Sequence, residues 1–283
     1  MAEELQILAL TEHDLPEALG LSTQAGWNQT IDDWRTLLWY AGTCLAGKIA
    51  GRLVASGTIQ FNGDCGWVGM LLVDEAHRGR GHGSKMFDML LKVADEMRKY
   101  LWLGLDATEL GIPIYLKRGF REIGKIHRWQ LAIPHRLPRL FSVREYRHDT
   151  DYDRLHSLDK EACGAWRLLM WKNDSDVDEC VCEKDDEFLG FGYSRPGRIG
   201  QYIGPVVAKS DAAAAGIIAQ LMERFAENPQ MPVFIDVPGN SSIEPWLKSE
   251  GFEIVRSWSR MVRGMAERGN PEMIFGIAGP ELG

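Results

Sequence analysis

Arginines and glycines alternate in the seven residues from Arg78 to Ser84, and this pattern can bind an anion. The three glycines of this turn let backbone N–H groups point toward one spot. The two arginines add planar guanidinium groups, which match the geometry of phosphate oxygens. A helix that starts within the turn would contribute its unpaired amides and the positive end of its dipole. We therefore expect the turn to bind a pyrophosphate.

The elements on either side of the turn must hold it in place. The stretch from Val68 to Val73 is apolar apart from one glycine, which is typical of a strand covered on both faces. After the turn, apolar residues recur at helical spacing up to Met97. Two other phosphate-binding loops do not fit, because a dinucleotide-binding turn needs glycine where Ser84 stands and a P-loop needs Gly-Lys-Ser/Thr.

The spacing Arg78-x-x-Gly81-x-Gly83 after a buried strand resembles the acetyl-CoA signature of the GNAT superfamily of N-acetyltransferases. A second landmark supports the resemblance, because Tyr115 stands four residues before Gly119-Phe120 and is similar to the family's closing Tyr-x-x-x-Gly-Phe. The alternative is a solvated basic turn that binds no ligand.

The resemblance implies an N-acetyltransferase that moves an acetyl group from acetyl-CoA to a primary amine. It also implies that the central strand splays near Met70 and offers backbone amides to the thioester, and that Tyr115 is the catalytic acid that protonates the departing thiolate. A tyrosine that merely packs on the sheet is the alternative for Tyr115. The cofactor-binding residues implied are Leu72, Val73, Arg78, Gly79, Arg80, Gly81, His82, Gly83 and Ser84.

A general base cannot be assigned from the sequence. Asp64, Asp74, Asp106 and Glu109 lie in suitable regions, but spacing alone places none of them beside an acceptor nitrogen. We assign His82 to the phosphate site or to solvent rather than to proton transfer.

The second half of the chain repeats the first. Gly204 aligns with Gly69 without a gap, and the strands and helices that follow recur in the same order. In this alignment three alanines, 213 to 215, replace Arg78, Gly79 and Arg80, and Ile218 replaces Gly83. Leu247 stands four residues before Gly251, where the first half has Tyr115 before Gly119.

We therefore predict an α/β (α+β) protein of two tandem GNAT-like domains, each a mixed, twisted central sheet flanked by helices. The strand from Phe120 to Leu131 is expected to close the first sheet, and the proline-containing linker at 134–139 separates the domains. The N-terminal domain, 1–135, would bind acetyl-CoA, whereas the cofactor turn of the C-terminal domain, 136–283, is degenerate.

Composition narrows the class of protein further. The length of 283 residues suits two domains. The net charge of −8 argues against a nucleic-acid-binding protein, whose binding surface would be basic. It has neither an N-terminal signal pattern nor an apolar run of about 18 residues, so we expect a cytoplasmic protein away from membranes. Its five cysteines form no disulfide framework, and Cys180-x-Cys182 predicts a strand rather than a metal site.

The acceptor is predicted only as a small-molecule or peptide amine, and the oligomeric state is left open. Trp27, Trp34, Trp39 and Tyr40 are candidates either for an acceptor pocket or for the core. We expect the second domain to shape or cover the acceptor pocket, with the acidic segment 174–179 as a possible attractor for a cation. A non-catalytic acyl-CoA sensor or interaction module is the alternative function.

Overall fold

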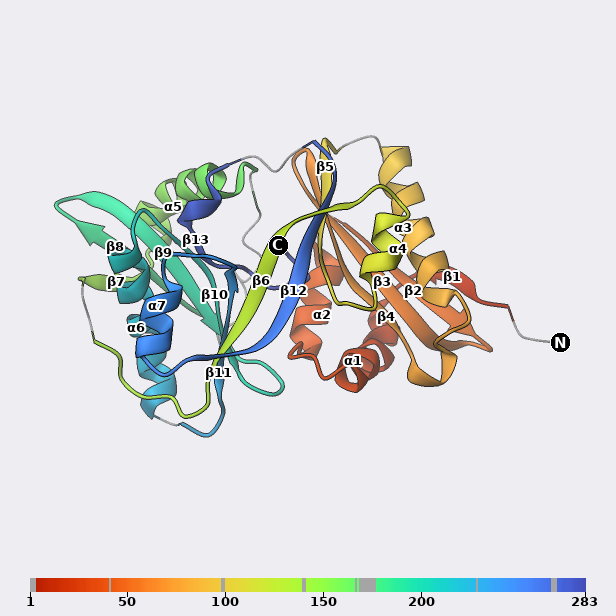
Figure 1. Ribbon diagram of the computed structural model, residues 1–283, viewed down its shortest axis with the longest axis horizontal. Helices are drawn as coiled ribbons and strands as arrows, with labels where there is room; N and C mark the ends of the chain where they lie inside the picture. The colour runs from red at the N-terminus through yellow and green to blue at the C-terminus, as the bar shows by residue number, and fades with distance from the viewer. Residues whose placement is uncertain are drawn as a thin grey trace.

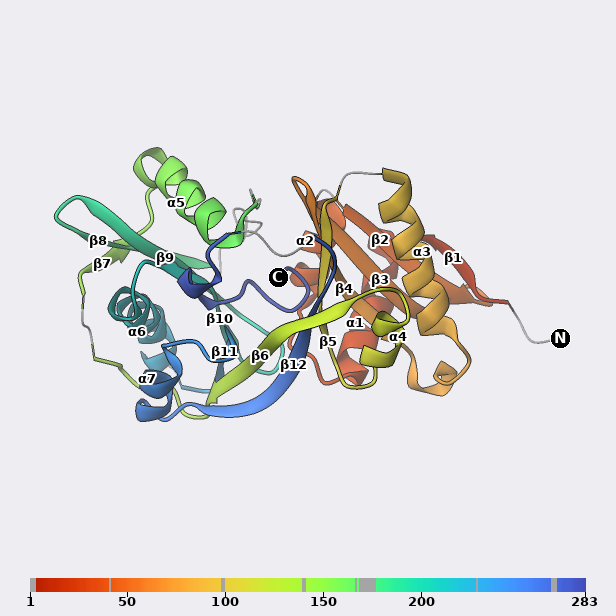
Figure 2. The same cartoon turned by 45° about the horizontal axis from the view of Figure 1, so that its top comes forward.

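A computed structural model describes residues 4–40, 42–97, 100–138, 141–165, 167, 177–227, 229–265 and 269–283. Two lobes lie side by side and are joined by two long strands, β6 and β12 (Figures 1 and 2). The helices are α1 (Leu15–Gln24), α2 (Ile31–Trp39), α3 (His82–Met97), α4 (Ile112–Leu116), α5 (His148–Cys163), α6 (Asp211–Glu227) and α7 (Glu244–Ser249). The strands are β1 (Gln6–Ala9), β2 (Gly42–Ile49), β3 (Arg52–Asn62), β4 (Cys65–Val73), β5 (Trp102–Ala107), β6 (Arg121–Leu131), β7 (Val143–Glu145), β8 (Asp178–Lys184), β9 (Glu187–Arg195), β10 (Gln201–Ala208), β11 (Val233–Pro238), β12 (Glu253–Gly264) and β13 (Ile274–Gly276).

The first lobe is an antiparallel meander, β1 to β4, with helices on both faces. Alternate residues of its strands face opposite sides, so Leu45 packs with α3 while Cys44 and Ala46 pack with α1 and α2. β4 then pairs in parallel with β5, which follows α3. The predicted mixed sheet flanked by helices is confirmed.

The second lobe repeats this plan with β7 to β11 and with α5, α6 and α7. Cys180 and Cys182 lie in β8, as predicted, and both are buried. The three alanines 213 to 215 lie buried in the first turns of α6, and Leu247 of α7 is also fully buried. The residues aligned with the turn at 78–84 therefore serve as core in this lobe.

The two lobes exchange their last strands, which the sequence did not predict. The strand expected to close the first sheet, β6, pairs with β12 and β11 instead, and β12 of the second half pairs with β5. The described strands thus form one sheet in the order β1-β2-β3-β4-β5-β12-β6-β11-β10-β9-β8-β7, with β13 beside β10. Hydrophobic alternation marks both strands in the sequence, but alternation does not specify a partner.

Two buried ion pairs connect the exchanged strands to their neighbours in the sheet. Arg128 of β6 binds Asp236 of β11 through two hydrogen bonds of 2.7 and 2.6 Å, and Arg260 of β12 binds Asp106 of β5 through two of 3.0 and 2.9 Å. Each arginine lies directly opposite its aspartate in the strand register. The two pairs follow the internal repeat, because β6 corresponds to β12 and β5 to β11.

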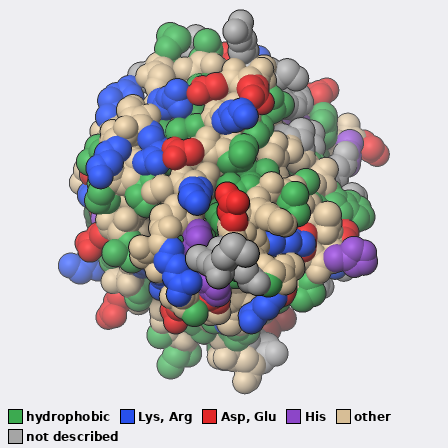
Figure 3. Space-filling model, turned by 90° about the vertical axis from the view of Figure 1, so that its right-hand side faces the viewer, with side chains coloured by type: hydrophobic (Ala, Val, Ile, Leu, Met, Phe, Trp, Pro, Cys, Tyr) green, Lys and Arg blue, Asp and Glu red, His purple; other side chains and the backbone are tan. Residues whose placement is uncertain are grey.

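Charged side chains on the face of the first lobe in Figure 3 are interspersed, with basic and acidic groups side by side. Among the described residues, no helix is long and apolar enough to cross a membrane. Within the same ranges no group of three or more His, Cys, Asp or Glu side chains is placed to hold a metal ion.

Candidate functional site

The site begins where β4 leaves β5. These parallel strands are paired only from Cys65 to Trp67, opposite 102–104. A bulge follows, because Met70 has φ 49° and the register with β3 shifts between Ser56 and Thr58. The Ser56 hydroxyl donates to the Met70 carbonyl at 2.8 Å and holds the bulge. The backbone from about Met70 to Val73 therefore turns away from β5 and borders an opening in the sheet.

A groove runs from this opening to the turn before α3. Gly79 and Gly81 have φ of 75° and 80°, which requires glycine, and α3 begins at His82. The groove is lined by nine of the ten residues singled out from the sequence, namely Leu72, Val73, Arg78, Gly79, Gly81, His82, Gly83, Ser84 and Tyr115.

Arg80 is the exception, since it does not line the groove. Its guanidinium donates to the Ala76 carbonyl at 3.1 Å. Arg78 is anchored through Nε to the Val73 carbonyl at 3.0 Å, and its side chain is 47% exposed. His82 is buried, its Nδ1 has no hydrogen-bond partner among the described residues, and burial lowers its pKa.

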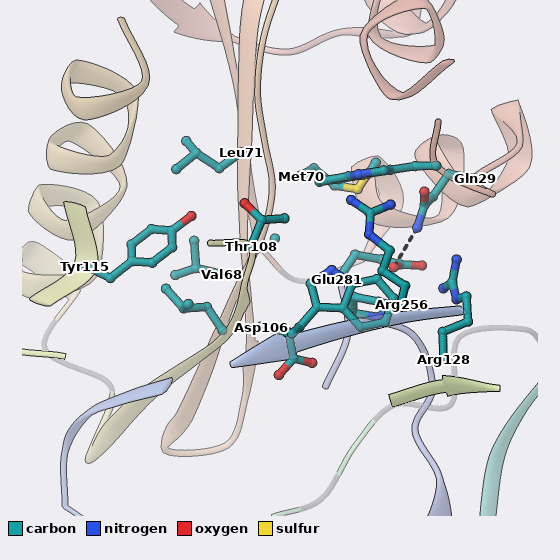
Figure 4. Close-up of a pocket in the computed structure, with 15 residues that line it drawn as sticks. Gln29, Val68, Met70, Leu71, Asp106, Thr108, Tyr115, Arg128, Arg256 and Glu281 are labelled. Atoms are coloured by element: carbon teal, nitrogen blue, oxygen red, sulfur yellow. Dashed lines mark hydrogen bonds between the residues drawn. The ribbon is translucent and has the colours of Figure 1, made fainter. Parts of the chain in front are cut away.

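Tyr115 lies at the inner end of the groove. Its ring packs edge-on against Phe87, with centroids 4.8 Å apart, and covers Gly111. Its hydroxyl points toward Leu71 and Thr108 (Figure 4). Burial raises the pKa of the phenol to about 12, so the proton stays on the oxygen at neutral pH. Tyr115 is therefore packed in the core of this lobe and also lines the groove, so its position is compatible with both sequence interpretations.

A second cavity lies on the far side of the opening and meets the groove there. The residues common to both are Trp27, Leu71, Thr108, Tyr115 and Arg256. The rest of the cavity wall comes from both halves of the chain: Gln29, Val68, Gly69, Met70, Leu105, Asp106, Arg128, Trp258, Pro280 and Glu281. Groove and cavity thus adjoin, with Tyr115 among the residues that line both. Figure 4 shows the residues of the cavity.

Glu281 reaches the cavity from the C-terminal tail, 277–283. The tail is held to β4, because the Trp67 indole donates to the Pro280 carbonyl at 2.9 Å. A Cβ on Gly69 would stand 2.9 Å from both the Cα and the carbonyl oxygen of Glu281, so only glycine permits this approach. The second half of the chain therefore supplies part of the cavity wall, as the sequence led us to expect.

The Glu281 carboxyl is 3% exposed and accepts hydrogen bonds from two residues. Gln29 Nε2 donates to one oxygen at 2.8 Å, and Arg195 donates to the other at 3.4 Å. Burial raises the pKa of Glu281 to about 7, against the opposing attraction of Arg195. At neutral pH this carboxyl exchanges between its acid and carboxylate forms.

Two arginines of the exchanged strands also line the cavity. Arg128 is buried and bound to Asp236. Arg256 of β12 is half-buried and makes no ion pair with a described residue. Its side chain extends past Glu281 in Figure 4. Burial and the nearby Arg128 lower the pKa of Arg256, but a guanidinium remains charged.

The earlier candidates for a base are placed elsewhere or already paired. Asp106 lines the cavity, but Arg260 holds both of its oxygens. Asp74 binds Gln24 and His77, and its pKa is lowered, chiefly by the Gln24 hydrogen bond. Glu109 is exposed.

Of the four aromatic candidates, only Trp27 lines the cavity. Trp34 is fully buried in the core, and Trp39 is 72% exposed. In the acidic segment, 174–176 lie outside the described residues, and Asp178 forms an ion pair with Arg224 at 2.9 Å.

In the second lobe the corresponding opening is filled by the chain itself. β10 and β11 are paired from Gln201 to Ile203 and then part, and β13 pairs with β10 beyond that point. Gly204, the counterpart of Gly69, lies against the Ile277 carbonyl, which a Cβ would meet at 2.1 Å. The same glycine position therefore admits a neighbouring segment in both lobes, but in the second lobe that segment occupies the split.

Comparison with known proteins agrees with this geometry. Residues 9–120 match the family model described as "Acetyltransferase (GNAT) family", and residues 155–276 match the one described as "Acetyltransferase (GNAT) domain". The chain belongs to the GNAT family. It is a tandem GNAT protein and, by family, an acyltransferase.

Similar proteins match most of the length of this chain. An uncharacterized N-acetyltransferase of Bacillus subtilis, YitH, is 27% identical over 257 residues, which is 87% of each chain. A crystal structure from Pyrococcus horikoshii, assigned as an acetyltransferase, is 23% identical with a TM-score of 0.82, over 99% of this chain and 96% of that one. A tandem GNAT protein from the clavulanic acid biosynthesis pathway is 15% identical with a TM-score of 0.66, over 93% of this chain and 98% of that one. The two structural likenesses show the fold.

Proposed function

We propose that this GNAT protein transfers the acetyl group of acetyl-CoA to a primary amine of a small molecule or peptide. The observation that carries the proposal is that the groove and the cavity meet at Tyr115. A donor in the groove and an acceptor in the cavity would then face each other across one opening.

The residues of the groove fit a CoA molecule. The turn and the first turn of α3 line its end and can offer their amides to phosphate, and Arg78 stands beside them with an exposed guanidinium. The unpartnered Nδ1 of His82 is a further buried polar atom at this place. Leu72 and Val73 would contact the pantetheine arm, and acetyl-CoA would supply an activated thioester at the opening.

The chain's own groups have two tasks at the opening. Backbone amides freed by the bulge near Met70 can stabilise negative charge on the thioester oxygen. Tyr115 keeps its proton at neutral pH and can pass it to the sulfur as the carbon–sulfur bond breaks and the amide bond forms. A primary amine is protonated at neutral pH, and this ammonium form must lose two protons in total: one passes to a base or water, and the other restores the Tyr115 hydroxyl.

We also propose a separate role for each half of the chain. Residues 1–135 carry the acetyl-CoA site, with Arg80 as an outer charge. Residues 136–283 bind no CoA, since alanines and Ile218 replace the charged turn and β13 occupies the split. The composition and the five cysteines, whose odd number and spacing predict no disulfide framework, favour a cytoplasmic location for the reaction.

Thiol release from acetyl-CoA in the presence of an amine panel tests the proposal. Tyr115→Phe keeps the ring and removes the proton, so we expect kcat to fall about 10²-fold while acetyl-CoA affinity changes little. Tyr100→Phe removes a hydroxyl bonded to Asp95, outside the site, and should leave kcat unchanged.

The rival function is a sensor that binds acyl-CoA without turnover. Binding of acetyl-CoA with no thiol release from any amine would favour the sensor. Equal turnover by the Tyr115→Phe variant would leave Tyr115 as a packing residue.

A further inference from the structure

We propose, on the basis of the function above, that the acceptor is an amine that also carries a carboxylate, as an amino acid does. Its carboxylate binds Arg256, and its amine lies at Glu281, which removes a proton from it. The two side chains line one cavity and come from the exchanged strand β12 and the C-terminal tail.

The charges of the cavity wall carry the first half of this inference. The other three ionisable acidic or basic groups of the wall have partners: Arg128 with Asp236, Asp106 with Arg260, and Glu281 with Arg195. Arg256 has no acidic or hydrogen-bonding partner in the described ranges, although its guanidinium stacks over the Trp258 ring at 5.3 Å. Arg256 is thus the one charged side chain of the wall without an ion pair to a described residue.

A half-buried guanidinium without an ion pair favours an anionic ligand group. Arginine presents its donors as a planar fork that matches both oxygens of a carboxylate. Arg256 stands where cavity and groove meet, so a small acceptor bound to it would lie beside the opening. The nearby Asp236 is bound to Arg128, so a carboxylate on the acceptor would give Arg256 an ion-pair partner of its own.

The second half of the inference rests on Glu281. Its oxygens accept hydrogen bonds from Gln29, Arg195 and its own backbone N–H, and a carboxylate, with about four lone-pair sites, has room left for an ammonium group. The pKa of Glu281, raised to about 7 by burial, suits a base that works at neutral pH.

The proton balance is complete with this base. An ammonium acceptor gives one proton to the Glu281 carboxylate, and the neutral nitrogen attacks the thioester carbon. The carbon–sulfur bond breaks, the sulfur takes the Tyr115 proton, and the second nitrogen proton restores the tyrosine. Glu281 then releases its proton to solvent.

Matched acceptors test the inference directly. Thiol release is measured with a panel of amino acids, their carboxamides and the amines that lack the carboxyl group. For the best acceptor we expect kcat/KM to exceed that of its carboxamide by about 10- to 100-fold, the range of a charge-assisted hydrogen bond. Arg256→Gln should abolish this preference, and Arg256→Lys should restore part of it.

The control is Arg263→Gln on the same strand, because Arg263 pairs with Asp95 and lines neither the groove nor the cavity. Equal use of acids and carboxamides by the unmodified protein would overturn the inference and leave the proposed function standing. An Arg256→Gln variant that raises the KM of acetyl-CoA equally with every acceptor would also overturn it, because Arg256 would then bind the cofactor. No turnover with any panel member would instead contradict the proposed function itself.

Discussion

The buried Glu281 carboxyl should make the stability of the protein depend on pH in a particular window. Burial raises its pKa from an ordinary 4.5 to about 7 in the folded chain. Between these values the folded state keeps a proton that the unfolded state has lost, so this group's contribution to stability falls as pH rises. At about 1.36 kcal/mol per pH unit, the full span corresponds to about 3 kcal/mol.

Glu281→Gln removes the titration while keeping a side chain of the same size that can bond Gln29. The unmodified protein should lose stability to this titration as pH rises, whereas the variant should not. The free energy of unfolding of the variant minus that of the unmodified protein should therefore increase by about 2 to 3 kcal/mol between pH 5 and pH 8. Urea unfolding at several pH values measures this difference, and no acceptor is needed. Glu227→Gln, at an exposed glutamate, is the control and should show no such trend. A difference for Glu281→Gln that is constant from pH 5 to pH 8 would refute the reasoning.

Three further predictions concern the groove, the tail and the reaction. Arg78→Ala should weaken acetyl-CoA binding about 10- to 100-fold in a calorimetric titration, and unchanged affinity would contradict the role of this arginine. Gly69→Ala should displace the tail by placing a Cβ 2.9 Å from Glu281, lowering acceptor turnover about 10- to 100-fold with acetyl-CoA affinity kept. Gly124→Ala, where a Cβ meets nothing within 4 Å, is its control. Because Glu281 must be a carboxylate to accept a proton, kcat/KM should rise with pH through about 7, and a profile flat from pH 6 to pH 8 would exclude it as the base.

Local sequence was sufficient to predict the cofactor side of the site. A strand, a glycine turn and a helix occupy consecutive residues from Val68 to Met97, so their geometry follows from short-range preferences. The positive φ values at Gly79 and Gly81 are what such a turn requires. The internal repeat likewise predicted the second lobe, because strand and helix patterns recur in register after Gly204.

The acceptor side of the site could not be predicted from the sequence, for physical reasons. Glu281 is 212 residues from Gly69 in sequence (281 − 69 = 212), and a single glutamate in a Gly-Pro-Glu tail carries no periodic or spacing signal. Arg256 reaches the cavity only because β12 crosses into the first lobe. The hydrophobic alternation of β6 and β12 is satisfied whether each strand stays in its own lobe or the two are exchanged. The exchange is therefore decided by tertiary contacts, such as the ion pair of Arg260 with Asp106.

The glycine at Gly83 offers the sharpest test of the central claim that one chain has one acetyl-CoA site, in its first half. A Cβ at Gly83 would meet only Val73 Cγ2, at 3.5 Å, so Gly83→Val should fold normally yet block the close approach of phosphate to the α3 amides. Gly20→Val, on the exposed surface of α1 with nothing within 4 Å, is the matched control.

Calorimetric titration with acetyl-CoA is the measurement. The account predicts one site per chain for the unmodified protein and for Gly20→Val, and no measurable site for Gly83→Val. Two equivalent sites per chain, or one site that Gly83→Val leaves unchanged, would contradict it.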